Sequence, residues 1–466
     1  MNRFILAPLL LLAGCNLAPP HSRPALPTPA AYPGDGPDGT QAAPGLSYQS
    51  YFPDARLNAL IGIGLDHNRD LAVATAQVAE AAALARIQRA DQLPGLGASA
   101  NVVRNRTSAS DTAGTSVTRT RYAGGLLVPA FELDFWGRVR NLSAAAREQY
   151  LASAEGERAF RLSLIRSIAG AYYSALETDE RVALAEATLF SRQEGLRIAK
   201  RRLDAGVTSA LDFRQSESLL TQAETELAGL RLARAEALNL LQQLVGGPIP
   251  DTLPAYLPLD AQRPPLLAAG LPSDLLTARP DIIAAEAQLR AARANIGAAR
   301  AAFFPSISLT GGLGYASTDL GSLFDSDGLN WTFGPSIDLP IFDWGRRRGN
   351  VDVAIARQDA AVANYERSVQ LAFREVADAL AGRRYLAEEV AAQQRATAAQ
   401  REIARLARTR YREGVAGYLE VLDAERNLFT AEQALLSLRR QELDILAVLF
   451  AALGGGVGTD GPHSRN

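Results

Sequence analysis

Apolar residues recur along this chain with two different periods, and each period occurs twice. Over 95–135 and again over 305–343, apolar residues alternate with small or polar ones, as in a strand with one apolar face. Over 137–203 and again over 345–411, apolar residues step by three and four, as in a helix. The pattern therefore predicts two copies of one unit, in which a strand hairpin precedes a very long helix.

The two copies are related by a constant offset. Trp136 to Arg138 repeats as Trp344 to Arg346, because 344 − 136 = 208. The turn Gly206-Val207 repeats as Gly414-Val415, because 414 − 206 = 208. At each Trp-Gly-Arg the strand-like alternation ends and the helical pattern begins. Two features that share one offset indicate an internal duplication.

A shorter helical pattern follows each long one, over 209–245 and over 418–453. A helix of about 65 residues would be about 100 Å long, and globular cores do not use helices of that length. The apolar residues of both return helices form a heptad seam, as in a coiled coil. The seam residues are Leu220, Ala223, Leu227, Leu230, Ala237, Leu241 and Leu244, repeated as Leu428, Ala431, Leu435, Leu438, Ile445, Leu449 and Ala452. We expect a long antiparallel helical hairpin in each repeat.

The strand segments allow two interpretations. Apolar residues alternating with small or polar ones over about ten residues are typical of a membrane β-barrel, but also of a hairpin on a soluble core. Four strands per chain cannot close a barrel, and an open sheet edge is not tolerated in lipid. Three chains would supply twelve strands and an aqueous pore. The predicted fold class is therefore mixed all-α plus membrane β-barrel, a trimeric twelve-stranded barrel continued by a helical coiled-coil tunnel in the periplasm.

The remaining segments set the domain boundaries. A helical pattern runs from Tyr51 to about Gln92, where Pro94 stops it, and a second helix precedes the second strand hairpin. The predicted parts are a first repeat over 51–245, a proline-rich equatorial connector over 246–272, a second repeat over 273–453 and a disordered tail over 454–466.

The N-terminus reads as an export signal. A short basic start and a short apolar run over 1–14 end in Leu-Ala-Gly-Cys, which resembles a bacterial lipoprotein signal with acylation of Cys15. Asn16 then favours the outer membrane. Such lipoproteins carry N-palmitoyl and S-diacylglycerol groups, and the alternative is an incidental thiol. We expect no other cofactor, and 15–50 to be a proline-rich tether that supplements another membrane attachment.

Composition excludes several classes of function. Lys+Arg 48 against Asp+Glu 50 gives a formal charge of −2, so nucleic acid is not an expected partner. The three histidines have no metal-ligand spacing, and no serine, cysteine or histidine arrangement suggests a nucleophile with its base. We expect neither an enzyme nor a metal site.

Acidic residues follow both glycine turns. Glu420 and Asp423 lie three residues apart on one face of the second return helix, and Asp212 is the offset partner of Glu420. They are either helix N-terminal acids favoured by the macrodipole or, in an oligomer, a ring of negative charge.

The chain resembles a known family. Ala278 to Gly314, both Trp-Gly-Arg junctions and the lipoprotein signal look like the outer-membrane efflux lipoproteins of the TolC-like superfamily, the OprM and NodT group. The resemblance implies a homotrimer with an equatorial belt, located in the Gram-negative outer membrane with a periplasmic extension. It also implies partnership with a periplasmic adaptor (membrane fusion) protein and an inner-membrane RND pump.

The resemblance also implies site residues. In such proteins acidic residues narrow the periplasmic end of the tunnel, and Tyr411, Gly414, Glu420 and Asp423 occupy the matching positions here. We expect the periplasmic gate to consist of Asp212, Tyr411, Glu420 and Asp423. Gly206 and Gly414 mark the expected adaptor-docking tips. The expected function is a passive exit duct for drugs or other small toxic compounds. The alternatives are an exit duct for secreted proteins and a lipid-anchored periplasmic scaffold without a pore.

Overall fold

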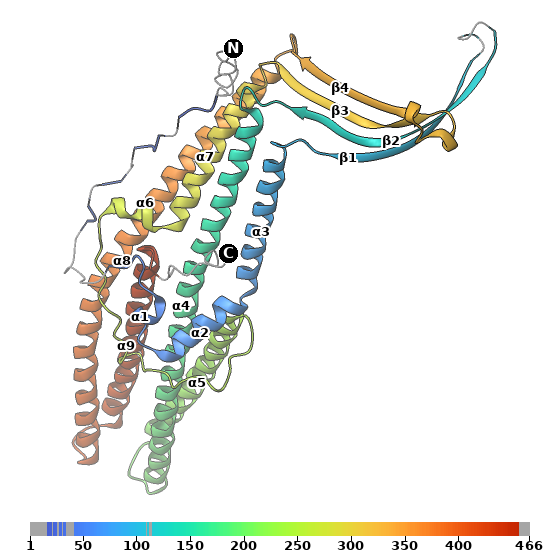
Figure 1. Ribbon diagram of the computed structural model, residues 1–466. Coiled ribbons are helices and arrows are strands. Elements are labelled where there is room, and N and C mark those ends of the chain that lie inside the picture. Colours follow the sequence, from blue (N-terminus) through green and yellow to red (C-terminus); the bar gives the residue numbers. More distant parts are fainter. Residues whose placement is uncertain are drawn as a thin grey trace. The chain divides into compact units, whose positions relative to one another are not determined.

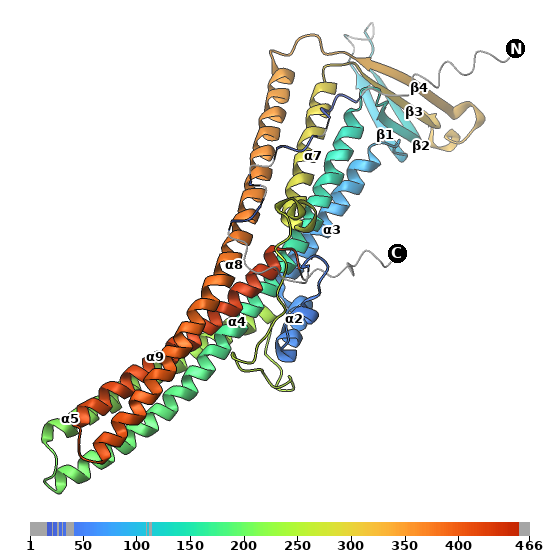
Figure 2. The same cartoon turned by 90° about the vertical axis from the view of Figure 1, so that its left-hand side faces the viewer.

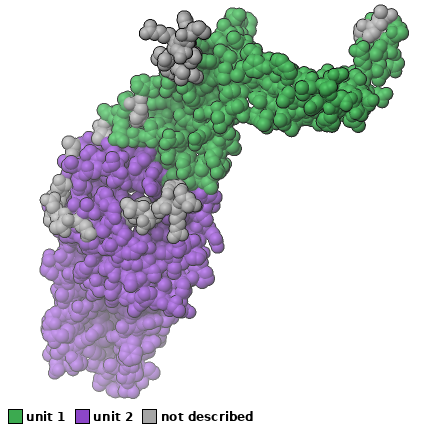
Figure 3. All heavy atoms as spheres, in the orientation of Figure 1, with its two compact units in different colours: residues 1–25, 77–154, 284–366 green, residues 26–76, 155–283, 367–466 purple. Residues whose placement is uncertain are grey.

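The structure is a computed structural model. It describes residues 16–20, 22–25, 28–29, 31–33, 42–108, 110 and 114–455. The predicted signal peptide, Cys15 and the tail from residue 456 therefore lie outside the described residues. The chain divides into two compact units, and both repeats contribute to each (Figure 3). Unit 1 comprises residues 1–25, 77–154 and 284–366, and unit 2 comprises residues 26–76, 155–283 and 367–466.

Unit 1 contains one four-stranded antiparallel sheet in the order β1-β2-β3-β4 (Figure 1). Its strands are β1 (Gly97–Thr107), β2 (Val117–Glu132), β3 (Ser306–Ser317) and β4 (Leu329–Asp338). Each repeat supplies one hairpin, and β2 pairs with β3 to join them. The predicted alternation continued past β4 to Leu339 and Ile341, but the strand ends at Asp338. Pro340 is the physical reason, because it lacks the N–H that a further ladder bond would need.

The sheet has one apolar and one polar face, defined by the register. Leu126, Leu313 and Trp331 lie opposite one another along one row, and Leu313 and Trp331 are more than half exposed. We call their side the apolar face. The next row places Gly125, Gly314 and Asn330 on the other side, the polar face.

Two local irregularities of the sheet have clear causes. The β2–β3 register shifts between Val128 and Phe131, where Pro129 interrupts the ladder, as the disturbed alternation near Pro129 predicts. Gly125 and Gly314 lie so close that a Cβ on Gly125 would be 2.5 Å from the Cα of Gly314. Only glycine permits this approach of the two strands.

In unit 1 the N-terminal segment follows helix α7 (Pro280–Ala301). Arg23 donates to both carboxylate oxygens of Glu286 over 2.9 and 3.0 Å. Further along α7, Arg293 donates to the carbonyl of Ser22 over 2.9 Å, and a Cβ on Gly297 would meet Ala18 at 2.8 Å. The part of the predicted tether between residues 16 and 25 is thus fixed along one helix.

In unit 2 the segment predicted as a single helix over 51–92 is broken twice. It forms α1 (Tyr48–Tyr51), α2 (Ala55–His67) and α3 (Arg69–Ala90), and the last is divided between the units. Asp54 caps α2 by accepting from the backbone N–H of Arg56 over 2.8 Å. The Asn68 side chain accepts from the backbone N–H of Leu71 over 2.9 Å and begins α3. Both breaks are capping residues that the apolar periodicity does not reveal.

The long helices are α4 (Arg138–Asp204) and α8 (Arg346–Arg412), each of 67 residues. Their return helices are α5 (Ala210–Val245) and α9 (Tyr418–Ala452), and both views place each beside its partner (Figures 1 and 2). These bounds lie within one residue of the predicted ones. Seam residues Leu227 and Leu230 are buried against Val182 and Ala185 of α4. The duplication therefore persists as two antiparallel helical hairpins.

The rest of unit 2 contains few regular elements. The connector between the repeats has no described helix or strand before a short 3-10 turn at Pro272–Asp274 and α6 (Leu275–Ala278). The predicted disordered tail begins too early, because Gly454 and Gly455 donate to the carbonyls of Ala451 and Phe450 over 3.0 Å each and so end α9. Among the described residues, no helix combines the length and apolar character needed to cross a membrane.

Candidate gate at the tips of the helical hairpins

Both hairpins turn with the same backbone geometry. Gly206 and Gly414 have φ of 71° and 75°, in the left-handed region that glycine adopts without strain. The N–H of Val207 donates to the carbonyl of Arg202 over 2.9 Å, and that of Val415 donates to Arg410 over 3.0 Å. These are helix C-terminal motifs related by the 208-residue offset. The two turns therefore contain equivalent backbone hydrogen bonds.

At the first tip, Asp212 serves the local turn. Its carboxylate accepts from the hydroxyl of Thr208 over 2.6 Å, and its backbone N–H donates to the Ser209 hydroxyl over 3.2 Å. The bond from Thr208 is the main cause that lowers the pKa of Asp212, and the positive charge of Arg202 contributes further. Asp212 lies in the first turn of α5, where the helix macrodipole favours a negative charge.

At the second tip, the acids form ion pairs. Gly417 stands at the N-cap of α9 and offers no side chain to the turn. Glu420 instead pairs with Arg410 of α8, with 2.9 Å between Oε1 and Nε. Asp423 pairs with Arg426 over 3.1 Å within α9. All four side chains are about half exposed, so copies from neighbouring chains could face a shared aqueous path.

Tyr411 connects the two hairpins. The guanidinium of Arg202 in α4 lies over its ring, 4.8 Å from the centroid. Its ring also contacts that of Tyr418 of α9, with 5.1 Å between the ring centroids. Burial raises the pKa of Tyr418, whose hydroxyl bonds with Ser216 of α5. The candidate gate therefore joins residues from all four helices.

The structure adds residues that sequence reasoning missed. Arg202 and Arg410 contact the predicted gate residues, and Tyr418 packs on one of them, yet none was singled out. A signal was available, because Arg202 and Arg410 are separated by the 208-residue offset. Arg410 supplies a positive charge to Glu420 from the preceding helix.

Both tips expose apolar side chains at equivalent positions. Val207 and Leu211 are 62% and 65% exposed, and Val415 and Leu419 are 68% and 55% exposed. In each pair the valine directly follows the tip glycine, Gly206 or Gly414, and the leucine lies in the first turn of the return helix. Two exposed aliphatic residues at each tip form a small surface suited to a protein partner.

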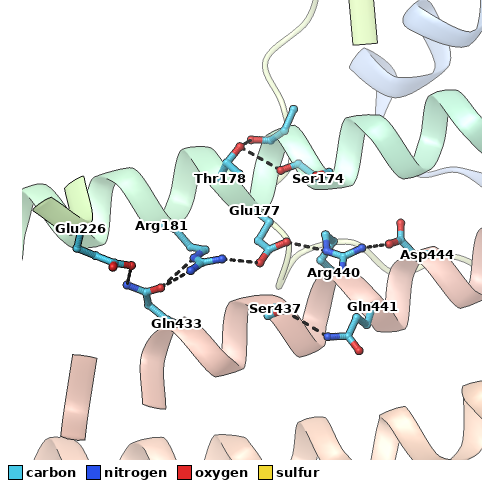
Figure 4. Close-up of polar contacts among 11 residues, drawn as sticks. Ser174, Glu177, Thr178, Arg181, Glu226, Gln433, Ser437, Arg440, Gln441 and Asp444 are labelled. Atoms are coloured by element: carbon cyan, nitrogen blue, oxygen red, sulfur yellow. Dashed lines mark hydrogen bonds and ion pairs between the residues drawn. The ribbon is translucent and has the colours of Figure 1, made fainter. Parts of the chain in front are cut away.

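Away from the tips, a chain of polar contacts ties α4 to α9 (Figure 4). Arg440 pairs with Glu177 over 2.6 Å and also with Asp444. Arg181 pairs with the same Glu177 over 3.3 Å and donates to Gln433 over 3.0 Å. Burial raises the pKa of Asp444 to about 6, although the positive charge of Arg440 acts in the opposite direction.

Among the described residues, no group of three or more His, Cys, Asp or Glu side chains is arranged to hold a metal ion. The ionisable groups described above form ion pairs and caps. The arrangement provides a pair of helical turns joined by the contact of Arg202 with Tyr411 and by the hydrogen bond of Tyr418 with Ser216.

The chain belongs to the outer membrane efflux protein family, whose model matches residues 60–247 and 271–455. It is 42% identical over 452 residues to the outer membrane protein OprJ of Pseudomonas aeruginosa, covering 96% of this chain and 94% of that protein. It is also 42% identical over 457 residues to the toluene efflux pump outer membrane protein TtgI of Pseudomonas putida, covering 96% and 97%.

A solved structure has the same fold. The MtrE outer membrane channel of Neisseria gonorrhoeae, in its open state, superposes with a TM-score of 0.88 at 40% identity. The match covers 95% of this chain and 98% of that one. The predicted family and fold class, a TolC-like channel with four strands per chain in a trimeric barrel, are confirmed. The protein is an outer-membrane channel of an efflux system, so the predicted location and general function are confirmed as well.

Proposed function

We propose that this channel is the passive exit duct of a tripartite system with a periplasmic adaptor and an inner-membrane RND pump, and that it exports small toxic compounds. The main support is the match over nearly the whole chain to a protein named for toluene efflux. Small compounds are therefore favoured over secreted polypeptides as the cargo. We assign the chain no catalytic role, because the family and its relatives are channels.

The periplasmic end of the duct is narrowed at the second hairpin tip. Three copies of Glu420 and Asp423 would form a ring of negative charge that attracts cations and repels anions. Tyr411 adds a bulky ring at the same level, and Asp212 holds the neighbouring turn. Opening must break the contact between Arg202 and Tyr411 and the hydrogen bond between Tyr418 and Ser216. A cation–π contact contributes about 0.5–2 kcal/mol, more where the two groups are removed from water.

The tips that follow Gly206 and Gly414 are the docking sites for the adaptor. The support for this assignment is the exposed pair of aliphatic residues at each tip. A partner that covers both turns would remove this apolar surface from water. Docking at the tips would also act directly on the contacts that hold the gate.

Cys15 is the site of lipidation, with N-palmitoyl and S-diacylglycerol groups. The support comes from the signal over 1–14 and from the presence of a single cysteine. Mass spectrometry of the membrane-extracted protein should find both acyl groups, and an unmodified N-terminal peptide would refute this assignment.

Substrate export is tested in a Gram-negative strain that lacks its own efflux channels. Expression of this chain together with a periplasmic adaptor and an inner-membrane RND pump should lower accumulation of toluene and of a fluorescent drug. Omission of the chain should restore accumulation. If accumulation of both compounds is the same with and without the chain, while an exported polypeptide depends on it, the protein-export alternative is correct.

A further inference from the structure

Beyond the four-stranded part of the sheet, β1 and β2 continue alone as a two-stranded ribbon. The β2–β3 pairing ends at Tyr122 and Ser317, whereas the β1–β2 pairing continues to Thr107 and Val117 (Figure 1). We define the arginine ribbon as residues 103–107 and 117–121. It contains four arginines, Arg104, Arg106, Arg119 and Arg121, and no acidic residue.

The register divides these arginines equally between the two faces of the sheet. Residues directly opposite one another share a face, and successive residues of a strand alternate. Ala98 lies opposite Leu126 on the apolar face, and steps of two along β1 lead from it to Arg104 and Arg106. Gly125 lies on the polar face, and steps of two along β2 lead from it to Arg121 and Arg119.

The apolar face has the height of a membrane. The first of its apolar rows contains Ile307 and Ile337. The last contains Val102, Tyr122 and Ser317. The ten residue steps from Ile307 to Ser317 span about 34 Å, or about 26 Å along the barrel axis at a tilt of about 40°. The lipid-facing apolar band of such barrels is about 25 Å tall.

Arg104 therefore occupies the first row beyond the hydrocarbon, and Arg106 the next. The opposite ends of the strands connect to the helices, which belong to the periplasm in this class of channel. The arginine ribbon therefore lies at the outer leaflet. Arg104 and Arg106 are both exposed. Arg106 donates to the hydroxyl of Ser116 over 3.1 Å, and the described residues offer Arg104 no ion pair.

We propose that Arg104 and Arg106 bind the phosphate groups of a phosphorylated glycolipid in the outer leaflet of the outer membrane. A guanidinium matches phosphate with two parallel hydrogen bonds and keeps its charge at every relevant pH. The apolar rows directly beneath hold the acyl chains of the same lipid, so charge and apolar surface fit one molecule. The site is independent of the gate and of the proposed cargo.

The matched control lies in the same ribbon. Arg104→Gln/Arg106→Gln removes two charges from the lipid side, and Arg119→Gln/Arg121→Gln removes two from the polar face. Purified trimers in neutral detergent are mixed with bisphosphorylated lipid A, with its dephosphorylated form, or with inorganic phosphate. Bound lipid is counted by native mass spectrometry, and trimer formation is checked by heat-modifiable mobility on gels.

The expected result is binding of bisphosphorylated lipid A to the wild type and at least a roughly five-fold loss in the Arg104/Arg106 variant. The Arg119/Arg121 variant should retain binding within about two-fold. Equal loss in both variants would overturn the proposal in favour of general charge attraction. Equal binding of the dephosphorylated lipid would also overturn it, as would displacement of lipid A by inorganic phosphate at equal concentration.

Discussion

At the tip of the first hairpin Asp212 accepts from Thr208, while at the tip of the second hairpin Glu420 pairs with Arg410 of the preceding helix. The backbone of the two turns is the same, since equivalent N–H groups donate to equivalent carbonyls. The difference lies in the cap, which is Ser209 in the first tip and Gly417 in the second.

This difference shows that two copies of a duplicated turn can have different roles. The glycine that requires a positive φ is kept in both copies, because no other residue fits the turn without strain. The acid at the offset position is free to change its partner. In the first copy it stabilises the turn, and in the second it forms an ion pair between two helices. Gate chemistry is therefore concentrated in the second hairpin, to which the first contributes Arg202.

Of the substitutions considered, those at the exposed aliphatic pairs, where the two tips are alike, should have the largest effect, and the property affected is adaptor binding. Val415→Asp/Leu419→Asp should weaken adaptor binding by roughly 30-fold or more, because charges would replace apolar side chains at the contact. Val207→Asp/Leu211→Asp should have the same effect. The measurement is adaptor binding by surface plasmon resonance, together with drug accumulation in cells.

A control variant, Gln394→Asp, adds a charge at an exposed position of α8 away from the tips and should bind the adaptor normally. If one tip pair proved dispensable, the two tips would not be equivalent docking sites. Normal adaptor binding by both variants would remove the docking assignment altogether.

Substitution of the acids, at which the two tips differ, should have a smaller effect, and the properties affected are conductance and ion preference. Glu420→Ala/Asp423→Ala should raise single-channel conductance by roughly two-fold and weaken the preference for cations, because the ring of negative charge is lost. Asp212→Ala should leave both properties nearly unchanged. Planar bilayers with a potassium chloride gradient measure the two quantities together.

The control for this comparison is Glu402→Ala, which breaks the exposed pair between Glu402 and Arg405 in α8. It should leave conductance unaltered. Unchanged current in the Glu420/Asp423 variant, or an equal change in the Asp212 variant, would count against the assignment of the gate to the second tip.

The offset partners Arg202 and Arg410 should each influence opening modestly. Arg202→Ala removes the contact between the hairpins, and Arg410→Ala removes the pair within the second one. Each should raise the open probability by about two- to five-fold, the range for exposed charged contacts. High salt should open the wild type in the same way, because it screens exposed pairs.

Salt should have less effect on opening in the double variant Arg202→Ala/Arg410→Ala than in the wild type. An equal salt response in both proteins would show that other contacts hold the tips closed. Recordings at a fixed voltage in 0.1 M and 1 M salt, roughly a three-fold change in screening length, provide the comparison.

The smallest effect is expected for a substitution away from the tips, at Asp444, and the property affected is thermal stability. The pKa of Asp444 is raised from 3.8 to about 6 by burial, so the folded protein binds this proton more tightly than the unfolded chain does. The stabilisation from protonation is complete below about pH 4 and is lost as the pH rises through about 6. Asp444→Asn should therefore melt about 2–4 °C above the wild type at pH 7.5 and equally with it at pH 4.

Arg440 keeps its bond to Glu177 in this variant, so the link between α4 and α9 is retained. Calorimetry of the detergent-solubilised trimer at both pH values provides the measurement. A difference in melting temperature that does not depend on pH would refute the raised pKa. Channel conductance should match that of the wild type.

Much of the architecture could be predicted from periodicity alone. The bounds of α4 and α8 lie within one residue of the predicted ones, because helices of 67 residues repeat their apolar pattern many times over. The breaks at Asp54 and Asn68 could not be predicted in this way. Asp54 has no exposed surface and accepts from the hydroxyl of Tyr172 over 2.6 Å and from Gln262 over 2.9 Å. Both partners are distant in sequence, and periodicity says nothing of such contacts.

The candidate site was predicted in part. Tyr411, Glu420 and Asp423 follow from the family motif, and the structure supplies their partners. Arg202 lies 209 residues before Tyr411 in sequence, and only the packing of α4 against α8 and α9 brings the two together. The alternation of the strands likewise predicts an apolar face. Only the register shows which arginines of the ribbon lie on the same side of the sheet as that face.

By itself the sequence determined the duplication, the element types and the family, because each depends on local periods or on motifs. Tertiary structure decided what each copy does. Trp136 donates to the carbonyl of Pro305 over 2.8 Å and stacks on Phe304, whereas its repeat Trp344 is 90% exposed. The same three residues, Trp-Gly-Arg, thus have different surroundings in the two repeats. The physical reason is that a side chain's surroundings come from distant segments, and the two copies of a repeat in one chain do not have the same neighbours.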